Sequence, residues 1–291
     1  MLSPGVRASA YVRIAPVFTS EVEASPAQMS QPGQRPTPAV LWLASASPRR
    51  LQLLSLLGWP VEVRPVCVDE TPRTDEDAAS LAGRLALAKA RGCDGPDGQG
   101  AIVLAADTVV ADDAGLLGKP HGPAEAVCML DRLRGRTHRV VTALALRRLP
   151  DGTEAVDTCV TSVPMRDYTA QEVSDYVACG SPLDKAGAYG IQDWPFQPVA
   201  VDQLRGCYAN VMGLPLCHLA RAMRRMDLVP SVDVPAVCMA ETGYACPVYG
   251  AVLREAMGSA AWCWHWGCSW PGAVCSMVAN PSPARFCPPP R

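Results

Sequence analysis

The turn at residues 45–50 carries the clearest chemical pattern in the sequence, because small hydroxyl residues are followed there by a proline and two arginines. Its residues are Ser45, Ala46, Ser47, Pro48, Arg49 and Arg50. Pro48 suits the first position of a helix, where its missing N–H would be unpaired anyway, and Ser47 then falls at the N-cap. A helix start offers free N–H groups to an anion, and two guanidiniums add planar charged donors for phosphate oxygens. The turn is interpreted as phosphate-binding, and the alternative is an ordinary capped helix with two solvated arginines.

A second chemical signal is Asp107, which interrupts the apolar run of residues 101–110. A run of this kind is typical of a central strand that is covered on both faces. A carboxylate inside it needs a partner, a metal ion or a raised pKa, because burying its charge unpaired is costly. Ligands also collect at the strand ends of α/β sheets. The sequence therefore predicts a functional role for Asp107.

Two further carboxylates, Asp69 and Glu70, follow a predicted strand at residues 61–66. Two acids at a strand end indicate either a solvated loop or a site for a hard cation, since carboxylate oxygens are the ligands that such cations prefer. The sequence alone leaves both interpretations open.

Two lysines lie where an anionic partner would explain them. Lys89 falls only about 40° from Leu85 around a predicted helix, at roughly 100° per residue. It therefore either snorkels past the apolar face or pairs with an anion. Lys119 stands on a corner whose backbone is fixed by Gly118 and Pro120.

The segment at residues 182–192 combines two glycines with Asp184, Lys185 and Gln192. Glycines permit close approach of a ligand, and the Gln192 amide offers both a donor and an acceptor to a planar polar group. Taken alone, the segment is also compatible with an ordinary loop. His138 stands alone in the sequence and is predicted to be a hydrogen-bonded structural residue.

Hydrophobic periodicity and turn residues predict the elements that position these groups. Strands are expected at residues 40–44, 61–66, 101–110, 140–149 and 154–163, and helices at residues 48–57, 74–91 and 123–133 and from residue 169. The helix near residue 74 is placed by a capping-box pattern between Thr74 and Asp77. The alternation of strands and helices predicts an α/β fold.

Composition excludes some classes of function. A formal net charge of -2 and a pI near 6.1 give no global basic field, which argues against a nucleic-acid partner. No run of 18 apolar residues occurs, so no membrane-spanning helix is expected. Of the 13 cysteines, those from Cys67 to Cys217 are irregularly spaced and are predicted to be reduced, buried thiols. A cytoplasmic location is therefore expected.

Three regions are predicted from composition. Residues 1–38 are rich in Ser, Pro and Gln and are expected to be a disordered extension, and residues 39–226 form the main domain. Residues 227–291 form a tail rich in Cys, Trp and Pro, which we expect to be poorly folded or weakly packed. A zinc site in the tail is the alternative, although its cysteine spacing fits no standard module.

Eight ordered motifs spread over residues 41–225 together identify a family. They are SASPRR at 45–50, DE at 69–70, RLALAKA at 84–90, ADTVV at 106–110, GKP at 118–120, THRVVT at 137–142, DKAGAYGIQ at 184–192 and GLPL at 213–216. In combination they resemble the Maf family of nucleoside triphosphate pyrophosphatases. No single motif would be specific.

The resemblance implies an α/β fold with a mixed sheet and two lobes around a central cleft, like the inosine triphosphate pyrophosphatases. It implies hydrolysis of a nucleoside triphosphate to the monophosphate and pyrophosphate, with a divalent cation such as Mg²⁺ or Mn²⁺. By position, Asp107 resembles the proton acceptor, and Glu70 joins it in binding the metal. The residues that correspond to phosphate-binding groups are Ser45, Arg50, Lys89 and Lys119. A nucleoside triphosphate is thus the expected partner, and the resemblance leaves a homodimer open.

Substrate choice in this family is associated with three positions, which correspond here to Arg49, Thr108 and Gln192. All three resemble the branch that hydrolyses dTTP and UTP, and modified pyrimidine triphosphates are further expected substrates. Two alternatives are a 7-methyl-GTP pyrophosphatase and a non-catalytic nucleotide-binding regulator of cell division. One departure from the family concerns base preference, because residues 193–197 read Asp-Trp-Pro-Phe-Gln where a glycine-rich loop is usual.

Overall fold

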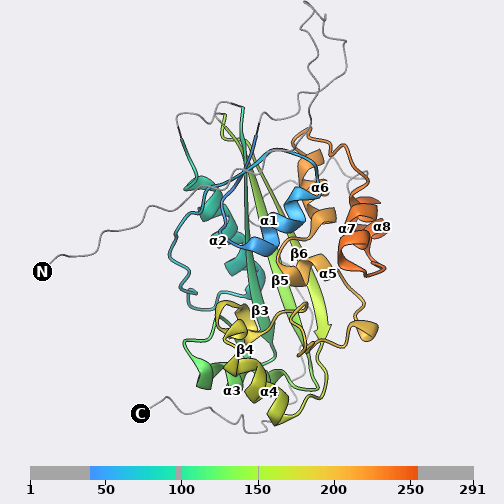
Figure 1. Cartoon of the computed structure of the whole chain (residues 1–291). Helices are drawn as coiled ribbons and strands as arrows, with labels where there is room; N and C mark the ends of the chain where they lie inside the picture. Colours follow the sequence, from blue (N-terminus) through green and yellow to red (C-terminus); the bar gives the residue numbers. More distant parts are fainter. Residues whose placement is uncertain (1–39, 96–99, 150, 255–291) are drawn as a thin grey trace, which may run out of the picture. The chain divides into compact units, whose positions relative to one another are not determined.

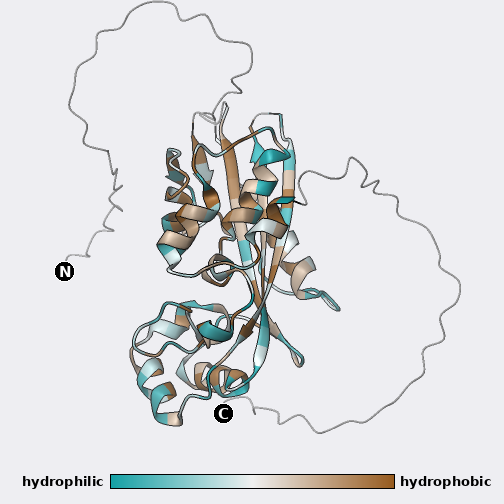
Figure 2. Cartoon of the chain, turned by 90° about the vertical axis from the view of Figure 1, so that its right-hand side faces the viewer, coloured by the Kyte–Doolittle hydropathy of each residue, from teal (hydrophilic) through white to brown (hydrophobic). Residues whose placement is uncertain are grey.

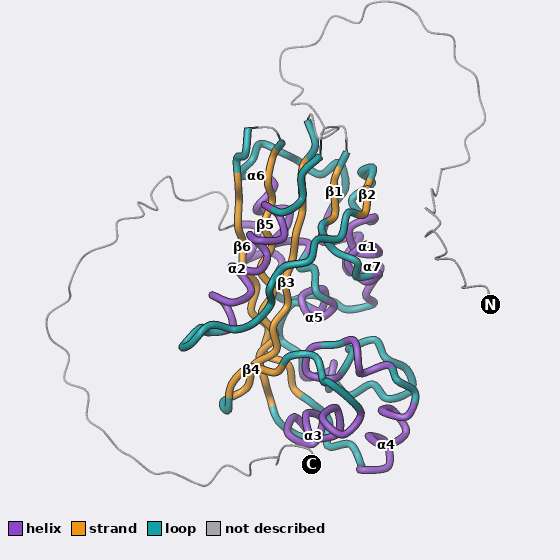
Figure 3. Tube along the Cα trace, turned by 90° about the vertical axis from the view of Figure 1, so that its left-hand side faces the viewer, coloured by secondary structure: helices purple, strands orange, loops and turns teal. Residues whose placement is uncertain are grey.

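The computed structural model describes residues 40–95, 100–149 and 151–254, so the expected extension at residues 1–38 lies outside the described chain. Its centre is a mixed sheet in the order β2-β1-β3-β5-β6, and β4 pairs with β3 alone. The strands are β1 (Leu41–Leu43), β2 (Val61–Val63), β3 (Ile102–Asp112), β4 (Gly115–Leu117), β5 (Thr137–Arg148) and β6 (Glu154–Pro164). β1 is parallel to β2 and β3, whereas β5 and β6 are antiparallel to their neighbours. Figure 3 shows β1 and β2 side by side at one edge of the sheet. The predicted mixed α/β sheet is confirmed.

Helices cover both faces of this sheet (Figure 1). In the described chain they are α1 (Pro48–Ser55), α2 (Ala78–Arg91), α3 (Pro123–Leu133), α4 (Ala170–Ala178), α5 (Tyr208–Met212), α6 (Leu216–Arg224), α7 (Val234–Thr242), α8 (Tyr249–Arg254) and the short 3₁₀ helices η1 (Ser181–Asp184), η2 (Ala186–Ala188) and η3 (Val201–Gln203). Leu81 and Leu85 of α2 belong to a core on one face, and Leu53 of α1 belongs to a larger core on the other.

The strands read as continuous apolar runs because alternate residues enter different cores. In β1, Leu41 and Leu43 join the larger core, whereas Trp42 joins the core under α2. β3 repeats the pattern, with Leu104 on one side and Val103 on the other. Successive side chains of a strand point to opposite faces, so a strand covered on both faces must be apolar throughout. Figure 2 shows these central strands coloured mainly as hydrophobic.

Two lobes share the long strands of the sheet. α3, α4 and β4 lie at one end of β3 and β5, and α1, α5 and α6 pack farther along the same strands (Figures 1 and 2). β3 and β5 contain 11 and 12 residues, whereas β1 contains 3, so only the long strands pass through both lobes. The two-lobed arrangement that the resemblance implied is confirmed.

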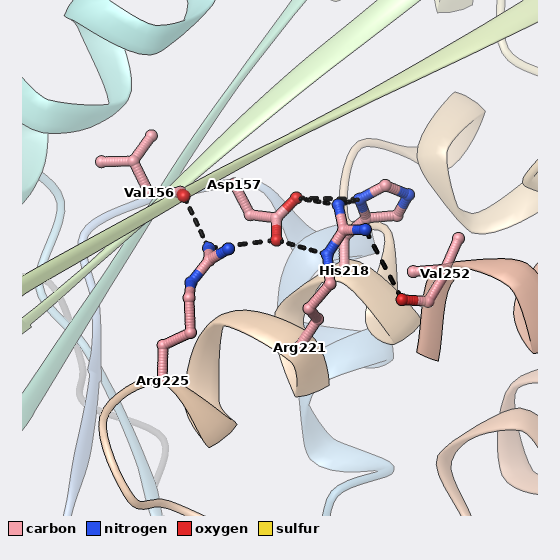
Figure 4. A network of polar contacts seen from close by, with 6 residues as sticks. All are labelled: Val156, Asp157, His218, Arg221, Arg225 and Val252. Atoms are coloured by element: carbon pink, nitrogen blue, oxygen red, sulfur yellow. Dashed lines mark hydrogen bonds and ion pairs between the residues drawn. The ribbon is translucent and has the colours of Figure 1, made fainter. Parts of the chain in front are cut away.

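A buried charge cluster fixes α6 to the outer strand β6 (Figure 4). Asp157 of β6 accepts hydrogen bonds from Arg221 at 2.7 and 2.8 Å and from Arg225 at 3.1 Å, and His218 Nδ1 lies 2.9 Å from its Oδ1. Burial would raise the pKa of Asp157, but Arg221 and His218 outweigh it and lower the pKa to about 2. Arg221 also donates to the carbonyl oxygen of Val252 in α8 at 3.5 Å. The cluster therefore joins sheet, helix and C-terminal segment.

The predicted start of α2 near Thr74 is wrong by four residues. α2 begins at Ala78, and its N-cap is Asp77, whose carboxylate accepts from the N–H of Ser80 at 2.7 Å. Asp75 has a φ of +59°, which is left-handed and incompatible with a helix there. The capping box predicted for α4 is present at Thr169 and Glu172.

The expectation of a poorly folded tail is wrong as far as Arg254, because two helices form there. α7 buries Val234 and Cys238, and α8 buries Val252. Between the two helices, the Tyr244 hydroxyl donates to the carbonyl oxygen of Leu204 at 2.9 Å. Packing against α5 and α6 thus orders a segment whose composition alone predicted little structure. Residues 255–291, including the alternative zinc site, lie outside the described residues.

The predicted state of the cysteines needs two corrections. Cys128 of α3 is disulfide-bonded rather than reduced. Cys93, Cys159, Cys207 and Cys217 are free and buried, as expected. Cys67 and Cys179 are free but exposed, because they lie in loops rather than in the cores. Among the described residues, none of the helices has the length and apolarity needed to cross a membrane.

Candidate active site

A cavity of about 580 Å³ lies between the two lobes. One wall comes from the 45–50 turn, from the segment that precedes α2, and from β3 itself. The other wall comes from the corner after β4 and from the segment that begins at η1. The charged residues of its lining are Arg49, Arg50, Lys89, Lys119, Lys185, Glu70 and Asp184. Five cations against two carboxylates make the cavity suitable for a polyanion, although the whole chain is slightly acidic.

Arg50 is the most fixed of these cations. Its guanidinium donates to Ser45 Oγ at 3.1 Å, to Thr108 Oγ1 at 3.0 Å and to the carbonyl oxygen of Gly213 at 3.0 Å. Burial lowers the pKa of Arg50, but an arginine stays charged at neutral pH. Gly213 has a φ of +102°, and a Cβ there would lie 3.4 Å from Arg50 Nε. The glycine thus supplies both the backbone conformation and the space for the arginine.

The start of α1 leaves its first N–H groups available to a ligand. Ser47 occupies the N-cap position as predicted, but its side chain makes no cap hydrogen bond. Instead the Ser47 N–H donates to Ser45 Oγ at 3.3 Å, which shapes the turn. Pro48 is the first helical residue, and residues 45–50 all line the cavity. An anion at this place would meet the positive end of the helix dipole.

Lys89 joins the two carboxylates that the sequence singled out. Its Nζ lies 2.5 Å from Glu70 Oε1 and 2.7 Å from Asp107 Oδ1. The side chains of Lys89 and Asp107 are each 11% exposed, whereas that of Glu70 is 53% exposed. The alternative of an anionic partner for Lys89 is therefore confirmed. Two oxygens from different elements converge on one cationic position.

The environment shifts the two carboxyl groups in opposite directions. Burial raises the pKa of Asp107, and the charges of Lys89 and Arg50 offset this only in part. Burial also acts on Glu70, but Lys89, Lys119 and Arg50 outweigh it and lower the pKa of Glu70. A buried carboxylate with a raised pKa is suited to accept a proton, and an ionised one beside it is suited to hold a cation.

The other lobe contributes Lys119 and an aromatic wall. Lys119 is exposed on its corner and lines the cavity, and its charge acts on Glu70. Tyr189 also lines the cavity, and its hydroxyl lies 2.7 Å from His138 Nε2. Burial lowers the pKa of His138 to about 4, so the imidazole is neutral. The prediction that His138 is a hydrogen-bonded structural residue is confirmed.

Most of the predicted site residues meet at this cavity. Those that line it are Ser45, Arg49, Arg50, Glu70, Lys89, Thr108 and Lys119. Asp107 lies just behind the lining and reaches it through Lys89. Gln192 is exposed and lies outside the lining.

Sequence reasoning did not assign roles to several lining residues. Lys185 is buried, and Asp184 beside it holds its ammonium group at 2.9 Å. The Asp-Lys pair in a glycine-containing segment was the available signal. The contribution of Gly213 could not be anticipated, because it depends on the position of Arg50, 163 residues away.

Comparison with known proteins adds to this geometry. A family profile described as Maf-like protein matches residues 40–226, which is more than half of the 291 residues. The chain belongs to the Maf family. The resemblance drawn from eight motifs is therefore confirmed, and the cavity lies entirely within the Maf region.

Curated relatives cover most of the same region. A protein of Dehalococcoides mccartyi strain 195 is 44% identical over 190 residues, which are 65% of this chain and 84% of that protein. One of Moorella thermoacetica is 47% identical over 179 residues, which are 62% of this chain and 91% of that protein. Both are named dTTP/UTP pyrophosphatase. Among solved structures, the Ham1 protein of Staphylococcus aureus matches with a TM-score of 0.35 and 14% identity, covering 55% of this chain and 79% of that chain.

Proposed function

We propose that this Maf protein hydrolyses nucleoside triphosphates, with dTTP and UTP as preferred substrates, to the nucleoside monophosphate and pyrophosphate. The observation that carries the proposal is the cavity between the lobes, where cations outnumber carboxylates and behind whose lining Asp107 has a raised pKa. A triphosphate needs charge compensation along its length, and hydrolysis needs a base at one phosphorus. Relatives named dTTP/UTP pyrophosphatase support the substrate class.

The position of each residue determines whether it would bind phosphate or accept a proton. The α1 N-terminus and Arg50 would bind one end of the phosphate chain, and Lys119 would bind it from the other lobe. Asp107 would accept a proton from the water whose oxygen attacks the α-phosphorus. The bond between that phosphorus and the bridging oxygen then breaks, and pyrophosphate leaves with the bonding electron pair. Lys89 holds Asp107 in place through its 2.7 Å hydrogen bond, so the base is oriented before substrate arrives.

A divalent cation fits the donor set of this site. Glu70 and Asp107 offer carboxylate oxygens that already converge on a single cationic atom, the Nζ of Lys89. The described residues contain no group of three or more His, Cys, Asp or Glu side chains able to hold a metal. Mg²⁺ or Mn²⁺ would thus be held by these two carboxylates, with phosphate oxygens and water as further ligands. When bound, the cation would neutralise charge on the phosphates.

Base selection is proposed to involve Arg49, Thr108 and Gln192. Arg49 and Thr108 line the cavity, and Thr108 is fixed by hydrogen bonds to Arg50 and Thr142, each at 3.0 Å. The exposed position of Gln192 leaves its part in selection a prediction. A cytoplasmic location is proposed because most cysteines of the described chain are free thiols, and the homodimer also stays a prediction.

The test is pyrophosphate release from a nucleotide panel by the purified full chain with Mg²⁺ or Mn²⁺. We expect dTTP and UTP to give the highest kcat/KM, modified pyrimidine triphosphates to react, and EDTA to abolish turnover. Preference for 7-methyl-GTP would support the alternative branch. Nucleotide binding without turnover of any compound would contradict the proposal and support a non-catalytic regulator.

A further inference from the structure

The segment that departs from the family pattern contains Asp193, a carboxylate with three partners in the second lobe. Asp193 Oδ2 accepts a hydrogen bond from the Tyr176 hydroxyl at 2.5 Å and one from Ser181 Oγ at 3.0 Å. The Nζ of Lys185 lies 3.4 Å from the same oxygen. These three donors come from α4, η1 and the residue that follows η1, so one oxygen joins separate parts of the lobe.

Lys185 carries this connection to the cavity. Its Nζ also hydrogen-bonds to the backbone carbonyl and the hydroxyl of Ser181 and to Asp184 Oδ1. Lys185 is buried, yet it lines the cavity together with Asp184, Ala186 and Tyr189. The Asp193 carboxylate therefore lies behind the wall of the cavity, and its charge compensates a cation of that wall.

The backbone of the same segment is held in two further places. Tyr176 Oη accepts from the N–H of Gly190 at 3.2 Å, so Tyr176 bridges Gly190 and Asp193. A Cβ at Gly190 would lie 2.4 Å from Asp193 Oδ1, and the absence of a side chain there permits this contact. Phe196 stacks on Tyr176 with ring centroids 4.3 Å apart, so the ring of Tyr176 is also held by an aromatic contact.

The hydrogen bonds around Asp193 and Lys185 also extend to the corner that carries Lys119. Gly187 donates its N–H to the carbonyl oxygen of Gly118 at 2.9 Å, and Ala188 donates to the carbonyl oxygen of Lys185 at 3.0 Å. Gly118 directly precedes Lys119, and Gln192 directly precedes Asp193. The segment thus lies between a cation expected to bind phosphate and a residue expected to select the base.

We propose that Asp193 is a positioning residue that holds the wall at residues 184–192 in the arrangement that binds the nucleotide. The inference rests on the proposed function and adds a residue outside the cavity to it. Asp193 replaces the backbone freedom of a glycine-rich loop with a fixed carboxylate, so binding entropy is saved before substrate arrives. A residue of this kind affects substrate binding and leaves the contacts of Lys89 with Asp107 and Glu70 unchanged.

The experiment compares Asp193→Ala and Asp193→Asn with Asp202→Asn, a matched change at an exposed aspartate of η3. Asp193→Ala removes all three contacts and is expected to raise KM for UTP about tenfold, with kcat within about threefold of the parent value. Asp193→Asn keeps an acceptor for Tyr176 and Ser181 but loses the charge opposite Lys185, so about a threefold rise is expected. Asp202→Asn is expected to leave both constants unchanged.

Binding of a non-hydrolysable UTP analogue, measured by calorimetry, makes the result independent of turnover. The same rank order in Kd supports the inference. An unchanged Kd and KM in folded Asp193→Ala overturns it, and so does a fall in melting temperature with no rise in either constant, since that is the result of a purely structural role. Failure of the proposed function is distinct, because the parent chain would then release no pyrophosphate from any nucleotide.

Discussion

Two aspartates of the same sheet are almost equally buried but lie in opposite electrostatic environments. Taken as whole residues, Asp107 on β3 is 8% exposed and Asp157 on β6 is 5% exposed. Asp157 meets two arginines and a histidine, whereas Asp107 hydrogen-bonds to a single lysine. The pKa of Asp157 is accordingly lowered to about 2, and the pKa of Asp107 is raised.

The difference shows that burial does not by itself mark a functional carboxylate. Around Asp157 the donors saturate both oxygens, so the charge is stabilised and serves to join α6 and α8 to the sheet. Around Asp107 the compensation is incomplete, and the group retains the capacity to take up a proton. An incompletely satisfied buried carboxylate beside a cationic cavity is therefore the better candidate for catalysis.

The largest effect is expected on activity, when Asp107 is replaced. Asp107→Asn removes the proton acceptor and should lower kcat by about 10²- to 10⁴-fold, the usual contribution of a general base. Single-turnover pyrophosphate release measures it. Asp113→Asn, at an exposed turn beyond β3, is the matched control and should match the parent chain. Undiminished turnover after Asp107→Asn would refute the assignment.

Asp157→Asn should produce the opposite pattern. It leaves Arg221 and Arg225 without a countercharge, and removing one member of a buried ion cluster typically costs about 3 to 5 kcal/mol. Chemical denaturation should show this loss, whereas kcat of the folded variant should stay within about twofold of the parent value. Loss of kcat without loss of stability would reverse the roles assigned to the two aspartates.

The two groups also predict separate dependences on pH. Asp157 has a folded pKa of about 2 against an ordinary value of 3.8, so its stabilisation is present above pH 3.8 and is lost as the pH falls toward 2. Asp107 has a raised pKa, so kcat/KM should fall on the acid side with an apparent pKa above 3.8. Unfolding curves and pH–rate profiles separate the two. Asp157→Asn should reduce the dependence of stability on pH and leave the pH–rate profile unchanged.

The smallest expected effect distinguishes the two arginines of the 45–50 turn. Arg50 is held by Ser45, Thr108 and Gly213, so Arg50→Ala should weaken the binding of all nucleotides by the same factor. Arg49 lines the cavity, and its charge acts on Asp184 across it. Arg49→Trp should change the ratio of kcat/KM for UTP over 7-methyl-GTP by about tenfold. An equal shift of that ratio by Arg50→Ala would contradict the division.

Much of the site could be predicted because its residues violate local patterns. Asp107 interrupts an apolar run and Lys89 lies beside an apolar face, and each anomaly is explained by the other at 2.7 Å. The Asp157 cluster violates a pattern as well, since Asp157 lies on the same inward face of β6 as the apolar Ala155 and Cys159. Its partners are more than 60 residues away, so the spacing in the sequence could not identify them.

Other features depended on tertiary packing that composition does not encode. α7 packs on α5 and α6, although its own sequence has weak amphipathic character. The role of Ser47 was predicted by position but not by contact, because its hydroxyl makes no cap hydrogen bond and its N–H donates to Ser45 Oγ. α2 starts later than predicted because the Asp77 carboxylate accepts from the Ser80 N–H, and aspartate is a better N-cap than Thr74 would be.

Hydrolysis of UTP in oxygen-18-labelled water tests the central claim most directly. If water activated by Asp107 attacks the α-phosphorus, mass spectrometry will find one labelled oxygen in UMP and none in pyrophosphate. Label in pyrophosphate or orthophosphate would place the attack at the β- or γ-phosphorus. That result would contradict the proposed geometry of water, base and phosphate chain.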